Sequence, residues 1–77
     1  MHHLYLIDDN INNFKYVSDC LIEIMQHVPT QAEQCCVIAN NNGKCHIKKG
    51  DYMELLELKE NFDQKNIQVE ITSQIHD

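Results

Sequence analysis

The 77-residue chain has no long hydrophobic run, no basic stripe, one proline and only two glycines. A bilayer-spanning helix needs about 20 predominantly apolar residues, so the sequence predicts no transmembrane segment. The first residues lack the pattern of a secretory signal peptide, which favours a cytoplasmic location. With 12 acidic against 6 basic residues, the net charge is −6, and binding to nucleic acid or to anionic membranes is disfavoured. A cationic partner, such as the α-amino group of a peptide, suits this charge better.

Four cysteines in so short a chain raise the question of disulfides or of a zinc site. Cys35, Cys36 and Cys45, together with His46, are the residues to consider as zinc ligands. No pair has the two-residue spacing of a zinc knuckle, and adjacent residues on a helix point about 100° apart. Reduced, buried thiols of a cytosolic protein are therefore the favoured interpretation.

The two histidines near the N-terminus also allow two interpretations. His2 and His3 either coordinate a metal or are exposed terminal residues, native or left from a purification tag. We expect neither a metal nor another cofactor. We also expect no enzyme activity, because the sequence shows no catalytic motif that would combine a general base, a group that orients it and an oxyanion donor.

The hydrophobic pattern predicts three strands and three helices in the order β-α-α-β-α-β. The strands are expected over residues 4–8, 44–49 and 67–72. The first helix has an apolar stripe at steps of three and four residues and ends before Pro29. The second begins at a Thr30–Glu33 capping box and ends at residues 40–43, and the third begins at Asp51 and runs to about Gln64. The stripe consists of Phe14, Val17, Leu21, Ile24 and Val28.

The same pattern assigns side chains to the core. In the second strand, Cys45 and Ile47 are expected to face inward, and Lys44, His46 and Lys48 outward. The expected buried residues of the last two helices are Ala32, Cys35, Cys36, Ile38, Ala39, Tyr52, Leu55, Leu56 and Phe62. The prediction is an α+β fold: a small three-stranded, mainly antiparallel sheet with three helices packed on it. Residues 1–77 are expected to form one domain with a polar tail at 73–77.

Two stretches of this pattern resemble the ClpS family, the adaptors of the Clp AAA+ protease. The first strand of the family ends in Asn-Asp-Asp-x-Thr-Pro-Met, and the corresponding stretch here is Asp8-Asp9-Asn10-Ile11-Asn12-Asn13-Phe14. The second helix of the family ends in a Val-His pair with a glycine just beyond, and the corresponding residues here are Ala39, Asn40 and Gly43. The likeness extends without a gap from Leu4 to about Cys45, and to Ile71 with a shorter third helix.

The resemblance implies an adaptor that binds the N-terminal residue of an N-degron protein and presents it to a Clp unfoldase. The implied partners are the N-terminal domain of a ClpA- or ClpC-type AAA+ unfoldase and substrate proteins with destabilising N-terminal residues. The adaptor is expected to be a monomer. The implied ligands of the substrate α-amino group are Asp8, Asp9, Asn10 and Asn40. The implied pocket for its side chain consists of Asn12, Phe14, Val17, Cys36, Ala39 and Ile67.

The chemistry of these residues supports such a site. A protonated α-amino group has three donors and one positive charge, so it needs a carboxylate and neutral acceptors. Asp8 and Asp9 supply the carboxylates, and Asn10 and Asn40 supply amide oxygens. The structural alternatives are that the two acids form a solvated turn and helix cap, and that Asn40 simply ends a helix.

The sequence also departs from the family in the pocket. The Thr-Pro of the family is replaced by Asn12-Asn13 and its first Met by Phe14. Its second Met is replaced by the smaller Cys36 and its His by Asn40, so the pocket is expected to be reshaped. The alternative function is a ClpS-like interaction module that docks on a Clp chaperone, or on another partner, without reading N-degrons.

Overall fold

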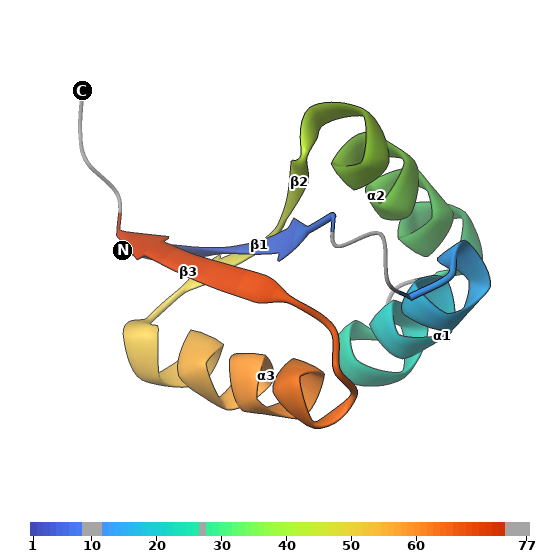
Figure 1. Cartoon of the computed structure of the whole chain (residues 1–77). Helices are drawn as coiled ribbons and strands as arrows, with labels where there is room; N and C mark the ends of the chain where they lie inside the picture. Colours follow the sequence, from blue (N-terminus) through green and yellow to red (C-terminus); the bar gives the residue numbers. More distant parts are fainter. Residues whose placement is uncertain (9–11, 27, 74–77) are drawn as a thin grey trace.

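The computed structural model describes residues 1–8, 12–26 and 28–73 of the chain. Its elements are β1 (His2–Ile7), α1 (Phe14–Met25), α2 (Pro29–Asn42), β2 (Lys44–Gly50), α3 (Tyr52–Gln64) and β3 (Val69–Ser73) (Figure 1). This order confirms the predicted β-α-α-β-α-β arrangement and the α+β class. Within the described ranges, no helix is both long and apolar enough to cross a membrane.

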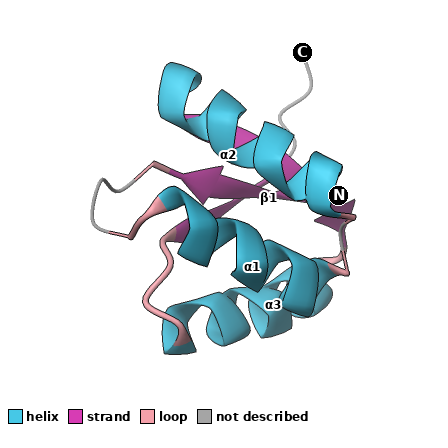
Figure 2. Ribbon diagram, turned by 90° about the vertical axis from the view of Figure 1, so that its right-hand side faces the viewer, coloured by secondary structure: helices cyan, strands magenta, loops and turns pink. Residues whose placement is uncertain are grey.

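The sheet has β1 at its centre, paired antiparallel with β2 on one side and β3 on the other. Leu4 and Leu6 of β1 are buried, whereas His3 and Tyr5, which alternate with them, are only half-buried. Because side chains of a strand alternate between faces, Leu4 and Leu6 mark the face that packs on the helices. Helix α2 contacts β2, and α3 contacts β3. Helix α1 lies between α2 and α3 and contacts both (Figure 2).

The hydrophobic core formed by the described residues lies between the sheet and the three helices. Its largest fully buried side chains come from β1, from α1, from α3 and from the segment that precedes β3. They are Leu4, Leu21, Leu55, Phe62 and Ile67. Full burial of one such side chain contributes about 1.5–3 kcal/mol to the stability of the fold. These residues therefore stabilise the packing of the helices on the sheet.

The junction between the first two helices differs from the prediction. Helix α1 ends at Met25, because Gln26 adopts a left-handed conformation with φ of 58°. Val28, which was predicted to extend the apolar stripe, is 60% exposed and is the N-cap residue of α2. Pro29 opens α2, so the predicted capping box at Thr30 is wrong. Proline suits the first position of a helix, where its missing N–H would have no partner.

The strands also begin and end at slightly different residues than predicted. β1 begins at His2 and ends at Ile7, one residue before Asp8. β3 begins only at Val69, after Asn66 has turned the chain with a φ of 62°. Ser73 belongs to β3, where it pairs with His2, so the predicted polar tail does not begin there. Residues 74–77 of that tail lie outside the described residues.

Several side chains differ in exposure from what the pattern predicts. Ile38 and Tyr52 are 43% and 47% exposed instead of buried. Lys48 was expected to face outward, but the pairing of β1 with β2 shifts register between Leu4 and Tyr5, which places Lys48 opposite the buried Leu4. Its Nζ atom lies 3.6 Å from a carboxylate oxygen of Glu54 in α3. An irregularity of this kind reverses the facing of later residues in a strand, and the alternation of residue types alone does not reveal it.

Candidate functional site

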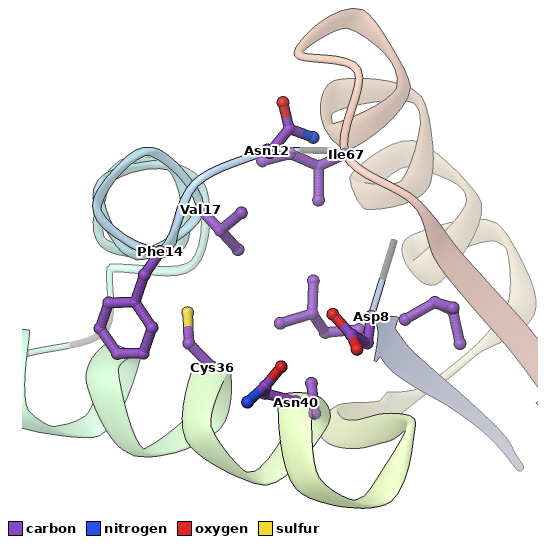
Figure 3. A pocket seen from close by; sticks show the side chains of 10 residues that line it. Asp8, Asn12, Phe14, Val17, Cys36, Asn40 and Ile67 are labelled. Carbon is purple, nitrogen blue, oxygen red and sulfur yellow. The ribbon is translucent and has the colours of Figure 1, made fainter. Parts of the chain in front are cut away.

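A cavity lies where the chain leaves β1, between the start of α1, the last turns of α2 and the connection from α3 to β3 (Figure 3). Its volume is about 280 Å³. The residues that line it are Leu6, Ile7, Asp8, Asn12, Phe14, Val17, Cys36, Ala39, Asn40 and Ile67. Because four separate segments of the chain contribute, the cavity depends on the tertiary fold.

Asp8 lies at the edge of the cavity, directly after the last residue of β1. Its backbone N–H donates a hydrogen bond to the carbonyl oxygen of Gly43 at 3.0 Å. The N–H of Ile7 donates to the carbonyl oxygen of Gln68, also at 3.0 Å. The end of β1 is thus bonded to segments on both of its sides. Figure 3 shows the half-buried Asp8 with its carboxylate directed toward the cavity.

The last turns of α2 supply a second wall. Cys36, Ala39 and Asn40 share one side of the helix, because residues three and four positions apart are neighbours on a helix surface. Cys36 and Ala39 are buried, and the Cys36 sulfur points into the cavity, while Asn40 is exposed at its rim (Figure 3). Gly43 ends the helix with φ of 91°, and its N–H donates to the carbonyl oxygen of Ala39 at 2.7 Å.

The start of α1 is held by side-chain hydrogen bonds. The side-chain oxygen of Asn13, the N-cap residue, accepts a hydrogen bond from the N–H of Tyr16 at 2.8 Å. The side-chain amide of Asn12 donates to the carbonyl oxygen of Asn66 at 2.7 Å. This second bond joins the segment before α1 to the connection before β3. Val17 of α1 and Ile67 of that connection both line the cavity (Figure 3).

Phe14 lies at the margin of the cavity rather than in its middle. Its side chain is 48% exposed, and Figure 3 shows the ring beside α2, near Cys36. The ring therefore does not fill the space between Asp8 and Asn40.

The charge of the cavity is concentrated at one end. Asp8 is the only ionisable carboxylate among the described residues that line it. Burial, together with the nearby Cys45 and Glu33, raises the pKa of Cys36, so its thiol stays neutral at physiological pH. The carbonyl end of α2 adds a partial negative charge beside Asn40. The cavity therefore offers an anionic end and an apolar wall, which together suit a cation attached to an apolar group.

Of the residues predicted for the site, eight line this one cavity: Asp8, Asn12, Phe14, Val17, Cys36, Ala39, Asn40 and Ile67. Asp9 and Asn10, the other two predicted ligands of the amino group, lie outside the described residues. The role of each residue toward a ligand stays a prediction. Leu6 and Ile7 line the cavity as well and were not predicted for it. Their position directly before Asp8 is the signal that would have included them.

The cysteines do not form the alternatives that the sequence allowed. Cys20, Cys35, Cys36 and Cys45 are all buried and none is in a disulfide. Within the described part of the chain, no group of three or more His, Cys, Asp or Glu side chains is arranged to hold a metal ion. The zinc ligand set considered around Cys45 and His46 therefore does not assemble.

Comparison with known proteins agrees with the geometry. The family model described as "ATP-dependent Clp protease adaptor protein ClpS" matches residues 1–76. No curated protein gives a significant match to the chain.

Proposed function

Because the chain belongs to the ClpS family of Clp protease adaptors, we propose that its cavity binds the N-terminal residue of substrate proteins. In this proposal the adaptor directs such substrates to degradation by a Clp AAA+ protease. Asp8 and Asn40 bind the α-amino group, and the apolar walls bind the first side chain.

One observation carries the proposal: the carboxylate end of β1 and the amide at the end of α2 line the same cavity. Asp8 and Asn40 are 32 positions apart in the sequence, yet the bond from the Asp8 N–H to the Gly43 carbonyl brings their segments together. A turn that served only to cap a helix would have no reason to face an apolar cavity.

The polar end has the composition that a peptide amino terminus requires. A protonated amine binds best where a carboxylate balances its charge and neutral oxygens accept its remaining protons. Asp8 supplies the carboxylate, and Asn40 supplies an amide oxygen. Each charge-assisted hydrogen bond contributes about 1.5–3 kcal/mol. Asp9 and Asn10 are proposed as further acceptors on the segment that follows Asp8.

The apolar part of the cavity suits the side chain of the first residue. Val17 and Ile67 both line it, and Cys36 and Ala39 form its wall on α2 (Figure 3). Transfer of an apolar side chain from water into such surroundings is favourable by about 25 cal/mol per Å² of buried area. In this proposal the cavity recognises two features of its ligand, a free amino group and an apolar first side chain.

Delivery completes the proposed function. We assign the partner as the N-terminal domain of a ClpA- or ClpC-type unfoldase, bound by a monomeric adaptor in the cytoplasm. The net charge of −6 favours the approach of a cationic amino terminus and disfavours anionic ligands.

Binding of matched peptides tests the proposal. Two peptides of identical sequence are compared by calorimetry, one with a free and one with an acetylated amino terminus. We expect the free peptide to bind at least about tenfold more tightly, since acetylation removes one charge-assisted interaction. Equal affinity would contradict the proposed site. If a Clp N-terminal domain then still bound the adaptor, the alternative of a docking module that does not read N-degrons would be favoured.

A further inference from the structure

The face of the sheet that points away from the hydrophobic core carries a pair of histidines on neighbouring strands. His3 lies in β1 and His46 in β2, and these strands run side by side (Figure 1). The Nδ1 atom of His3 lies 2.9 Å from the Nε2 atom of His46. Their ring centroids are 5.0 Å apart, with the ring planes inclined at 58°. We call these two residues the imidazole pair.

The structure pairs His3 with His46, whereas the sequence suggests a pair of His2 with His3. His2 and His3 are adjacent, but successive side chains of a strand point to opposite faces of the sheet. The His2 ring contacts Tyr52 at the start of α3, with ring centroids 5.3 Å apart. His3 instead meets His46, which is 43 residues away in the sequence. The partner of His3 is therefore set by strand pairing.

We propose that the imidazole pair is a binding site for a divalent cation of the zinc class, with His3 Nδ1 and His46 Nε2 as ligands and solvent in the other positions. Zinc–nitrogen bonds are about 2.0–2.1 Å long, so two ligands at 90–109° around one ion lie about 2.9–3.4 Å apart. The observed 2.9 Å is within this range. In the metal-free structure these two nitrogens share a hydrogen bond, so one of them carries a proton. An ion would take the place of that proton, and the ring that donated it would adopt its other neutral tautomer, which leaves a lone pair on each facing nitrogen.

The surroundings hold one ring of the pair in place. Tyr5, which is opposite His46 in the strand register, packs edge-on against its ring with centroids 5.3 Å apart. Because the two ligands stand on hydrogen-bonded strands, little conformational freedom is lost when an ion binds.

The ligand atoms, rather than the neighbouring charges, select the kind of ion. Lys49 is opposite His3 in the register, and the Lys44 ammonium lies 4.7 Å from the centre of the Tyr5 ring. These cations repel any divalent ion, so binding must come from the ligand bonds themselves. Both proposed ligands are nitrogens, whereas Ca²⁺ and Mg²⁺ prefer oxygen ligands. Zn²⁺, Ni²⁺ and Cu²⁺ bind neutral imidazole nitrogen strongly enough to be favoured here.

Zinc titration of the untagged full chain tests the site. Zn²⁺ is the preferred probe because, unlike Cu²⁺, it does not readily displace backbone amide protons at a chain terminus. We expect one ion per chain by calorimetry, and an increase in the unfolding temperature, because the ion joins β1 to β2 only in the folded state. His46→Ala and His3→Ala should each weaken binding at least tenfold and remove the temperature increase.

His2→Ala is the matched control, since it changes the adjacent residue on the other face of the sheet. It should bind Zn²⁺ as the unaltered chain does. The proposal is overturned if the unaltered chain binds no Zn²⁺, or if His46→Ala binds Zn²⁺ with unchanged affinity. It is also overturned if His2→Ala loses as much Zn²⁺ affinity as His3→Ala does. The last result would indicate chelation by the chain terminus instead. Unfolding curves of the metal-free variants establish that each is folded.

Discussion

The backbone N–H of Asp8 donates a 3.0 Å hydrogen bond to the carbonyl oxygen of Gly43. This bond joins the residue that leaves the central strand to the residue that ends α2. Gly43 in turn donates its own N–H to Ala39, so the last turn of α2 is closed at the same point. The two polar groups proposed to hold a substrate amino group, those of Asp8 and Asn40, are both placed by this short chain of bonds.

Removal of the negative charge at Asp8 should weaken binding of peptides with a free amino terminus. Asp8→Asn keeps the shape of the side chain but leaves no carboxylate among the described cavity residues. Loss of one charge-assisted hydrogen bond corresponds to about a 10- to 150-fold decrease in affinity. Calorimetry with free and acetylated peptides measures the effect. Asp19→Asn, which alters an exposed carboxylate paired with Lys15 on α1, is the control and should leave binding unchanged.

A large side chain at position 36 should close the cavity. The Cys36 sulfur points into the cavity (Figure 3), so the ring of Cys36→Phe would occupy the space assigned to the first residue of the substrate. We expect every N-terminal residue to bind at least about tenfold more weakly, because its side chain would lose about 1.5–3 kcal/mol of apolar burial. Val37→Phe places the same ring one residue further on, at a side chain that is 47% exposed. A similar loss of peptide affinity in both variants would argue against the assigned pocket.

Gly43 should be important for stability as well as for binding. Its φ of 91° is a conformation that other residues adopt only with strain, although a Cβ atom there would meet no atom within 4 Å. Gly43→Ala should therefore lower the free energy of unfolding by about 1–2 kcal/mol through backbone strain alone. Chemical denaturation measures this change. Gly43→Asn should lower the free energy of unfolding by less than Gly43→Ala does, since asparagine tolerates the left-handed conformation better than alanine. Equal stability of Gly43→Ala and the unaltered chain would contradict this explanation.

Alkaline pH should destabilise the protein through its buried thiols. Burial, and then a hydrogen bond with Cys45, raises the pKa of Cys35 far above its usual range. Above about pH 8.5 the unfolded chain releases the Cys35 proton while the folded chain keeps it. The contribution to stability is thus complete below that pH and is lost as the pH rises. The expected slope is at most about 1.4 kcal/mol per pH unit for this one group.

Denaturation curves between pH 7 and 10 check the alkaline effect. Cys35→Ala should have a lower free energy of unfolding at pH 7, because it lacks the buried thiol. Its free energy of unfolding should decrease less steeply as the pH rises. Val37→Ala, at an exposed position on the same helix, should keep the original slope. An unchanged slope in Cys35→Ala would mean that other groups cause the alkaline loss.

The sequence alone determined the element order and most of the core, because both follow from local hydrophobic periodicity and from residues that stop a helix or strand. The stripe from Phe14 through Leu21, the cap at Gly43 and the alternation around Val69 each need only neighbouring residues to be read. Its resemblance to one family also selected eight residues that the fold brings to one cavity.

The tertiary structure decided which distant groups meet and which face each one takes. The register shift that turned Lys48 toward Glu54, and the strand pairing that placed His3 beside His46, depend on contacts between strands. No pattern within one segment encodes such a shift, because strand register is set by packing across the sheet. For the same reason, only the folded chain places Asp8 and Asn40 around one cavity.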